Sequence, residues 1–282
     1  MFKPFLALVF IIFSTPLLAK QIVNVSGVYF PPYAFGDSEV TTRGILPELI
    51  AALNSQQSEF QFLIVPTSLQ RRYADLNSGR VDISLFENPD WGWQAIPHQT
   101  LDMGLEDAEV FVARTAQGRN QAYFDNILGK RLALFNGYHY VFAGFNTDPD
   151  YLAKNYNAMV SRSLDGNIKM VMHRRADIAL ITRSYLKVFL EDYPKYAKSL
   201  LISQRVDQIY RHHAILRPNS PISAQRFQQL FESLRQSGRL EKIFAPYSIK
   251  VEPDRQAESR AMQQAQQQPA QPQAEQVGHA QN

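Results

Sequence analysis

The sequence predicts an α/β protein built from two similar lobes, and two observations lead to this fold class. Between residues 21 and 250, short apolar segments alternate with amphipathic helices, as in parallel βαβ units. In addition, GRVDISLF at 79–86 is echoed by RRADIALI at 174–181, each with an Asp leading into an apolar segment. We interpret the echo as one unit from each lobe, although helix-to-strand transitions of this kind also recur by chance.

The N-terminal segment MFKPFLALVFIIFSTPLLAK has the order of a secretory signal peptide. Lys3 precedes an apolar run that ends at Phe13, and the small residue Ala19 closes the segment. The run is well short of the roughly 20 residues that a membrane-spanning helix needs, which argues against an anchor. We therefore expect residues 1–19 to be removed and the mature protein to be exported to the periplasm.

Eight segments have the apolar composition expected of strands. They are residues 22–29, 60–65, 81–86, 109–113, 131–135, 177–182, 200–203 and 213–216. Four helices are predicted between them, because apolar residues recur at a spacing near 3.6. Their stripes are Ile45, Leu49 and Leu53; Leu69, Tyr73 and Leu76; Leu164, Ile168 and Val171; and Phe227, Leu230, Phe231 and Leu234.

The composition limits both the ends of the chain and its possible partners. From about residue 251 the chain is rich in Gln, Ala and Pro, so we expect 251–282 to be a disordered tail. The net charge of +3 is too small to indicate binding to nucleic acid or to a membrane surface. The absence of cysteine excludes disulfides, thiolate metal sites and a cysteine nucleophile.

Six segments, in this order, resemble the bacterial solute-binding protein family 3, the type II periplasmic binding proteins of amino-acid transporters. They are YFPPYAF, TTRGILPELIAAL, LQRRYADLNSGRVDISL, ILGKRLALFNGYHY, HRRADIALI and SGRLEKIFAPY. The resemblance implies two α/β lobes joined by two hinge strands, here near 110–114 and 212–217. Lobe 1 would then be discontinuous, comprising 20–112 and 214–250, and lobe 2 would comprise 113–213.

The loop YFPPYAF carries four aromatic rings immediately after the first strand. Ligands of open α/β sheets bind beyond the carboxyl ends of the strands, so this loop lies at the expected ligand edge. The prolines stiffen the loop, and the rings offer an apolar wall. We expect Tyr33 and Phe35 to face a ligand while Tyr29 or Phe30 packs on the lobe. The alternative is that all four rings serve packing.

Arg71 and Arg72 are predicted in the first turn of a helix capped by Ser68, where a cation opposes the helix dipole. One of them could bind an anionic group of a ligand through its guanidinium fork. The resemblance to stand-alone members of the family assigns this role to Arg71. A solvated pair of arginines is the alternative.

The segment FENPDWGWQ departs from the amino-acid binders of the family, which carry small residues, a Thr and then an Arg for the α-carboxylate. Glu87, Asn88, Trp91 and Trp93 stand there instead, which argues against an ordinary amino acid. We expect Glu87 to meet a cationic or hydroxyl-rich group and Trp91 and Trp93 to line the site. Alternatively, the tryptophans cap the lobe.

The second lobe supplies four further candidates. Gly137 is placed at a strand-to-helix turn, where backbone N–H groups could approach an anionic group. Tyr138 and Tyr140 are expected to close the far side of the site. Thr182 ends the echo strand, where amino-acid binders of the family usually have an acidic residue.

The sequence offers no pattern for a metal or another cofactor. His212 and His213 are neighbours on a predicted strand and therefore point to opposite faces. No Ser–His–Asp order and no phosphate-binding loop is present.

We therefore expect a monomer that captures a small polar, amino-acid-like solute for an inner-membrane ABC permease. The alternative is a periplasmic sensor of the same fold that docks on a signalling receptor. An enzyme is a third hypothesis, because the fold occasionally hosts dehydratases. It needs an acid and a base in the cleft, and Glu48 and Glu87 are the only pair we can propose.

Overall fold

The computed structural model of the protein describes residues 19–35 and 43–253. The expected signal peptide, apart from Ala19, and the expected tail from residue 254 onward lie outside the described residues. The first residues assigned to that tail belong to the folded part. Val251 is in β9 (Lys250–Val251), which pairs with β4, and the Glu252 backbone N–H donates to the Gly104 carbonyl at 2.8 Å.

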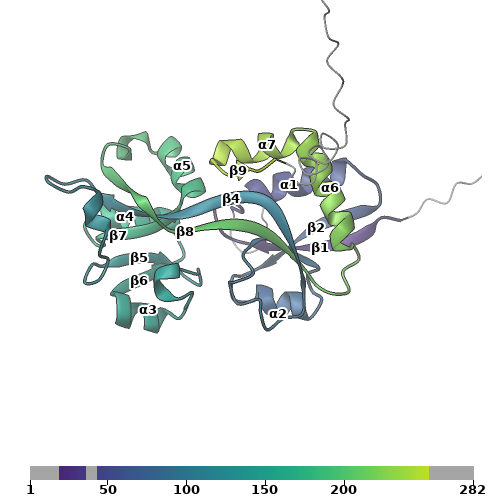
Figure 1. The fold of residues 1–282 in the computed structure, drawn as a ribbon, viewed down its shortest axis with the longest axis horizontal. Coiled ribbons are helices and arrows are strands. Elements are labelled where there is room, and N and C mark those ends of the chain that lie inside the picture. Colours follow the sequence, from purple (N-terminus) through teal and green to yellow (C-terminus); the bar gives the residue numbers. More distant parts are fainter. Residues whose placement is uncertain (1–18, 36–42, 254–282) are drawn as a thin grey trace, which may run out of the picture.

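The predicted lobes are two halves of one sheet whose described strands follow the order β2-β1-β3-β8-β4-β7-β5-β6. In the first half, β1 (Gln21–Val28) lies between β2 (Phe60–Thr67) and β3 (Ile83–Glu87) and is parallel to both. We call this half, with its helices, lobe 1. Figure 1 shows it as a body distinct from the other half.

Lobe 2 repeats this arrangement. β5 (Leu132–Phe135) lies between β6 (Ala158–Ser161) and β7 (Ile178–Thr182) and is parallel to both. Two long antiparallel strands, β4 (Gln99–Arg114) and β8 (Leu200–Leu216), run through both lobes and connect them (Figure 1).

Helices cover the sheet in each lobe (Figure 1). In lobe 1, α1 packs against α6 and α7, and α2 contacts β3. Their bounds are Ile45–Ser55 for α1, Arg72–Asn77 for α2, Ala224–Gln236 for α6 and Arg239–Phe244 for α7. Lobe 2 holds α3 (Pro149–Tyr156), α4 (Leu164–Met172) and α5 (Arg183–Asp192). Short 3-10 helices lie at Gln121–Phe124, Val141–Ala143, Pro194–Tyr196 and Ala245–Tyr247.

The sequence echo marks equivalent positions of the two lobes. Asp82, before β3, accepts from the Asn24 backbone N–H at 2.7 Å and from Arg217 Nε at 2.7 Å. Asp177, before β7, accepts from the Arg131 backbone N–H at 2.9 Å and from its Nε at 3.0 Å. In each lobe the echoed Asp therefore accepts hydrogen bonds from a backbone N–H in or next to the central strand and from an arginine side chain. The prediction of two similar lobes is confirmed.

The prediction of short, separate strands at 109–113, 200–203 and 213–216 is wrong. The first is the end of β4, and the other two are the ends of β8. The middle of β8 passes between the lobes, where alternate side chains are at least partly exposed to solvent. Polar residues therefore interrupt its apolar pattern. β3 pairs with β8 at 213–216 and β7 pairs with β4 at 109–112, so the crossing lies at about 103–108 and 208–212. It precedes the expected hinge at 110–114 and shares only residue 212 with the one expected at 212–217.

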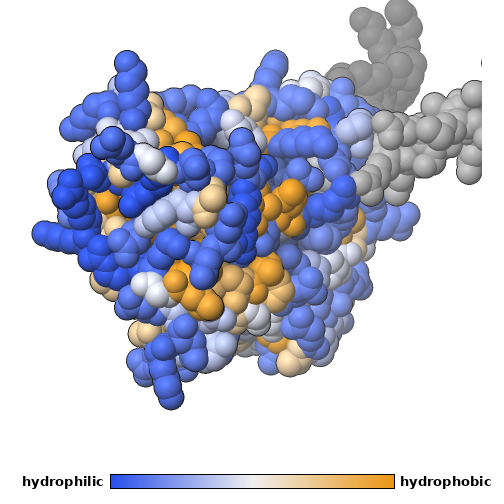
Figure 2. Space-filling view, turned by 60° about the vertical axis from the view of Figure 1, so that its left-hand side comes forward, coloured by the Kyte–Doolittle hydropathy of each residue, from blue (hydrophilic) through white to orange (hydrophobic). Residues whose placement is uncertain are grey.

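The core consists of apolar residues from both lobes, most of them on strands and on the inner faces of helices. Hydrophobic groups reach the surface only in separate places amid hydrophilic ones on the side shown in Figure 2. Within the described ranges, no helix has both the length and the apolar character needed to cross a membrane.

Candidate functional site

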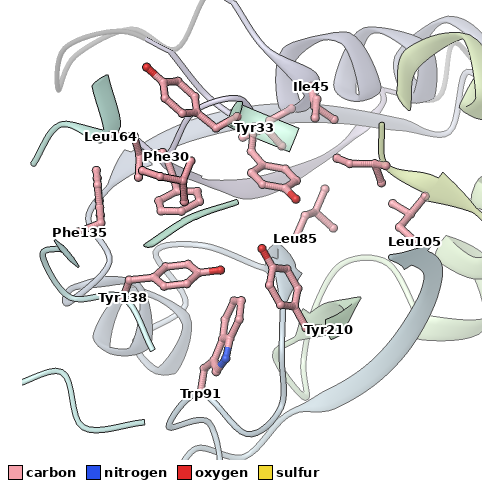
Figure 3. Packing of buried hydrophobic residues seen from close by; sticks show 14 of the residues in the cluster. Phe30, Tyr33, Ile45, Leu85, Trp91, Leu105, Phe135, Tyr138, Leu164 and Tyr210 are labelled. Atoms are coloured by element: carbon pink, nitrogen blue, oxygen red, sulfur yellow. The ribbon is translucent and has the colours of Figure 1, made fainter. Parts of the chain in front are cut away.

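A cavity between the lobes receives walls from lobe 1, lobe 2 and the crossing strand β8, and we call it the interlobe cavity. Its volume is about 50 Å³. Its described lining residues are Ser26, Val28, Phe30, Tyr33, Ala34, Leu46, Leu69, Arg72, Leu85, Phe86, Glu87, Trp91, Tyr138, His139, Tyr210 and His212. Figure 3 shows the rings of Phe30, Trp91 and three tyrosines around this space, and the hydroxyl groups of Tyr33, Tyr138 and Tyr210 point toward one another.

Aromatic rings from both lobes meet directly at this cavity. Phe30 of lobe 1 stacks on Tyr138 of lobe 2, with ring centroids 4.9 Å apart and planes 5° from parallel. Trp91 of lobe 1 stacks on His139 of lobe 2 at 5.7 Å. The Tyr210 ring of β8 stands edge-on to Trp91 at 5.3 Å. Flat rings of this kind can hold an apolar or cationic group with little loss of side-chain entropy.

A buried hydrogen-bond network joins the two lobes through β4. The Tyr33 hydroxyl lies 2.7 Å from Asp107 Oδ2 and 2.6 Å from His212 Nε2. Ser184, in the first turn of α5, donates from its hydroxyl to the same Asp107 oxygen at 2.6 Å. The two contacts of Tyr33 require two protons and the phenol has one, so either His212 or Asp107 supplies the second.

Glu109 lies two residues beyond Asp107 on the same face of β4 and is 1% exposed. Its carboxyl interacts with the Tyr138 hydroxyl of the cavity wall, although no hydrogen bond of normal geometry reaches Oε2 within the described ranges. Desolvation by burial, together with the nearby carboxylates of Asp207 and Asp107, raises its pKa well above the ordinary value. Burial also raises the pKa of Asp107, although the hydrogen bonds from Ser184 and Tyr33 act in the opposite direction.

A buried ion pair forms another wall of the cavity. Arg72 Nε lies 2.9 Å from Glu87 Oε1, and both side chains are almost completely buried. Ser84 donates to the same Glu87 oxygen at 2.8 Å, and Trp93 Nε1 donates to Glu87 Oε2 at 3.1 Å. The charge of Glu87 is therefore balanced inside lobe 1.

The two cavity histidines are held neutral. Burial and, to a lesser extent, the Arg72 charge lower the pKa of His139 to about 3. Burial also lowers the pKa of His212 to about 3. Near neutral pH, both rings therefore act as uncharged aromatic groups.

Four of the ten residues predicted for the site line the interlobe cavity. They are Tyr33, Glu87, Trp91 and Tyr138. The aromatic loop after β1 thus contributes a ring as expected, but Phe30 lines the cavity as well. Phe35 lies apart from it and lines two more open hollows at the surface, one of which includes Arg43 and Arg162.

The other predicted residues lie elsewhere. Arg71 is exposed and precedes α2, whereas Arg72, the first residue of α2, lines the cavity. The Ser68 hydroxyl accepts from the Arg71 backbone N–H at 3.2 Å. Trp93 is buried in lobe 1 against Tyr73, at 4.6 Å between ring centroids.

Three predicted residues of lobe 2 do not line the cavity either. The Tyr140 hydroxyl accepts from the Phe135 backbone N–H at 2.8 Å. Thr182 caps α5 by accepting from the Tyr185 backbone N–H at 3.3 Å. Gly137 has a φ of 77° and lies against the Gln70 side chain of lobe 1. The α-helix expected after Gly137 is wrong, because a 3-10 turn, Val141–Ala143, follows instead.

Sequence reasoning missed several cavity residues, among them Arg72, Tyr210 and His212 on the wall and Asp107 and Glu109 behind it. A signal for the last four was present. Asp107 and Glu109, like Tyr210 and His212, are separated by two positions, which places each pair on one face of a strand. Once β4 and β8 are recognised as continuous strands, each pair falls on the part of its strand that crosses between the lobes.

The structure does not bring Glu48 and Glu87 together. Glu48 is exposed and lines a separate surface hollow, whereas Glu87 is buried at the interlobe cavity. Across residues 19–35 and 43–253, no three His, Asp or Glu side chains are grouped so as to hold a metal ion.

No protein-family model matches the chain, and no curated protein matches its sequence. Solved structures do match. The GluR0 ligand-binding core from Nostoc punctiforme, in complex with L-glutamate, is 14% identical with a TM-score of 0.59, and the match covers 80% of this chain and 99% of that one. A substrate-binding protein of an ABC uptake transporter from Streptococcus pneumoniae, with bound histidine, is 16% identical with a TM-score of 0.63, covering 80% and 92%.

A third match is an ancestral amino-acid-binding protein described as a precursor of cyclohexadienyl dehydratase. It is 14% identical with a TM-score of 0.58, and the match covers 80% of this chain and 95% of that one. At such identities a match establishes the fold alone. The chain has the two-lobe fold of periplasmic binding proteins, which confirms the fold predicted from the six sequence segments.

Proposed function

We propose that the protein is a monomeric periplasmic solute-binding protein. It captures a small polar solute of amino-acid-like size between its lobes and delivers it to an inner-membrane ABC permease. The observation that carries this proposal is the interlobe cavity, whose walls come from both lobes and from the strand that joins them. A ligand there would contact both lobes and stabilise their closed arrangement.

Two further observations support capture. The cavity combines aromatic faces with a few buried polar groups, which is the usual composition of small-molecule sites. The structural neighbours include a substrate-binding protein of an ABC uptake transporter with bound histidine. The order of the N-terminal segment, expected to act as a signal peptide, is consistent with a periplasmic location.

The test of capture is a thermal-shift screen of the mature protein against amino acids, amines, organic acids and small sugars. A ligand that binds only the folded protein raises its melting temperature. The best compound should stabilise the parent protein but have a much smaller effect on Trp91→Ala. Tyr151→Ala, an exposed aromatic position on α3, is the matched control and should respond as the parent does. Equal stabilisation of Trp91→Ala would place capture outside the interlobe cavity.

Delivery to a permease requires a separate test. Cells that lack the gene should lose uptake of the labelled solute at low external concentration, and the intact gene should restore it. Unchanged uptake together with a lost transcriptional or chemotactic response would instead identify a sensor.

A further inference from the structure

The basic side chain that lines the interlobe cavity is already bound to groups of the protein. Among the described lining residues, Arg72 is the only Lys or Arg, and its nitrogens face protein oxygens. Nε pairs with Glu87 at 2.9 Å, Nη1 donates to the Leu69 carbonyl at 2.6 Å, and Nη2 donates to the Tyr73 hydroxyl at 2.8 Å. A carboxylate entering the cavity would have to displace Glu87, which would leave that buried acid without its partner.

Buried carboxylates without a basic partner stand on the β4 side of the cavity. Asp107 is 3% exposed and Glu109 is 1% exposed, and no ion pair of the described residues includes either of them. Asp107 is bound to the Tyr33 hydroxyl, a cavity group, and Glu109 interacts with the hydroxyl of Tyr138, another cavity group. A buried charge without a partner is costly, and a cation nearby would offset this cost.

The remaining walls favour positive charge as well. The faces of Trp91, Phe30 and Tyr138 carry the negative lobes of their ring quadrupoles. The Tyr138 hydroxyl interacts with the Glu109 carboxylate and with the Tyr210 hydroxyl, and the oxygen of either phenol can still accept from an ammonium group. In Figure 3 these two hydroxyls and that of Tyr33 lie near the centre, close to the rings.

We propose, resting on the proposed function, that the captured solute is an amine cation without a carboxylate, and not a zwitterionic amino acid. Its ammonium or methylated ammonium group would lie against Trp91 and Tyr138, within the field of Glu109 and Asp107. This class differs from glutamate and histidine, the amino acids bound to two of the structural neighbours.

The size of the space agrees with a compact head group. A water molecule needs roughly 10–15 Å³ on this measure of volume, so the cavity holds only a few atoms in the observed arrangement. A larger remainder of the solute would require the lobes to separate further.

The test uses the mature, unmodified protein and matched compounds in calorimetric titrations. Each set has one side chain and three head groups, for example isoamylamine, leucine and isoamyl alcohol. Agmatine with arginine, cadaverine with lysine and histamine with histidine extend the comparison, each with the alcohol in which a hydroxyl replaces the amino group that the amino acid carries on its α-carbon. We expect at least one amine to bind at least tenfold more tightly than both its amino acid and its neutral analogue.

Two outcomes separate the failure of this inference from that of capture. If an amino acid or an alcohol binds as tightly as its amine, the cation assignment is wrong and capture stands. If no compound of any set binds, capture of an amino-acid-sized solute is itself contradicted, and the inference fails with it.

A matched pair of variants locates the charge. Glu109→Gln keeps the side-chain volume and removes the charge, so amine affinity should fall at least tenfold while affinity for the neutral analogue stays unchanged. Glu106→Gln, on the same strand but on its opposite face, should leave both unchanged. An equal loss for amine and alcohol in Glu109→Gln would show a structural role for Glu109 and overturn the assignment.

Discussion

Phe30 and Tyr138 lie face to face across the two lobes, with ring centroids 4.9 Å apart and planes 5° from parallel. Phe30 follows β1 in lobe 1, and Tyr138 follows β5 in lobe 2, so the two rings occupy equivalent positions at the ligand edges of their sheets. Phe135 meets Phe30 edge-on at 5.1 Å and supports the stack from lobe 2. Closure of the lobes is therefore coupled to an aromatic contact that also forms a wall of the interlobe cavity.

Tyr138→Ala should open this contact. An aromatic pair contributes about 0.5–1.5 kcal/mol beyond the area that it buries, so its loss shifts the balance toward separated lobes. Small-angle scattering should show a larger radius of gyration, and affinity for the captured solute should fall about tenfold. Tyr138→Phe keeps the ring and should have the parent's radius of gyration. If Tyr138→Ala and Tyr138→Phe scatter identically, the stack does not hold the lobes together.

Tyr33→Phe should destabilise the protein through Asp107. The variant keeps the ring but removes the hydroxyl that bridges Asp107 and His212, leaving buried polar atoms with one partner fewer. Such a loss costs about 1–3 kcal/mol in the free energy of unfolding, measured by urea titration. Tyr29→Phe removes a hydroxyl from the same loop at an exposed position and should cost little. A parent-like Tyr33→Phe would mean that the network contributes nothing to stability.

Removing one charge of the Arg72–Glu87 pair should destabilise the protein more than removing both. Glu87→Gln leaves the buried guanidinium without a counter-charge, and removal of one partner of a buried pair costs about 3–5 kcal/mol. The double variant Arg72→Met with Glu87→Gln removes both charges and should recover most of this loss. Chemical denaturation of the single and double variants measures the coupling. Additive effects would show that the two charges do not depend on each other.

The two lobes and part of the cavity wall could be predicted from the sequence. Particular residues show which other features could not. The echoed Asp82 and Asp177 identified equivalent units because each side chain binds the backbone of its own lobe. The choice of Arg71 over Arg72 followed the resemblance, although Arg72 lies three residues after Leu69 and four before Leu76 and therefore shares the apolar face of the predicted helix.

Asp107 and Tyr210 were missed for a different reason. They lie on the parts of β4 and β8 that cross between the lobes, where one face is buried and the other meets solvent. The resulting alternation has no continuous apolar run and was not recognised as a strand. Their roles depend on contacts with Tyr33 and Trp91, which lie far away in the sequence and meet them only in the folded chain.

His212 should make stability depend on pH in the acidic range. Burial lowers the pKa of its ring from 6.5 to about 3 in the folded protein, so between these values the unfolded chain binds a proton that the folded chain does not. The folded state therefore loses free energy relative to the unfolded state as pH falls below 6.5, at up to about 1.4 kcal/mol per pH unit.

Glu109 and Asp107 act in the opposite direction, since their raised pKa values let the folded protein bind protons first as pH falls. The effect of His212 is therefore measured by difference, from urea titrations of the parent and of His212→Gln between pH 6.5 and about 4.5. The parent should lose roughly 2 kcal/mol more than the variant over this range. His173→Gln, at an exposed position on the C-terminal side of α4, is the matched control and should follow the parent. Parallel curves for the parent and His212→Gln would show that the ring gains a proton as readily in the folded protein as in the unfolded chain, which the buried contact with Tyr33 does not permit.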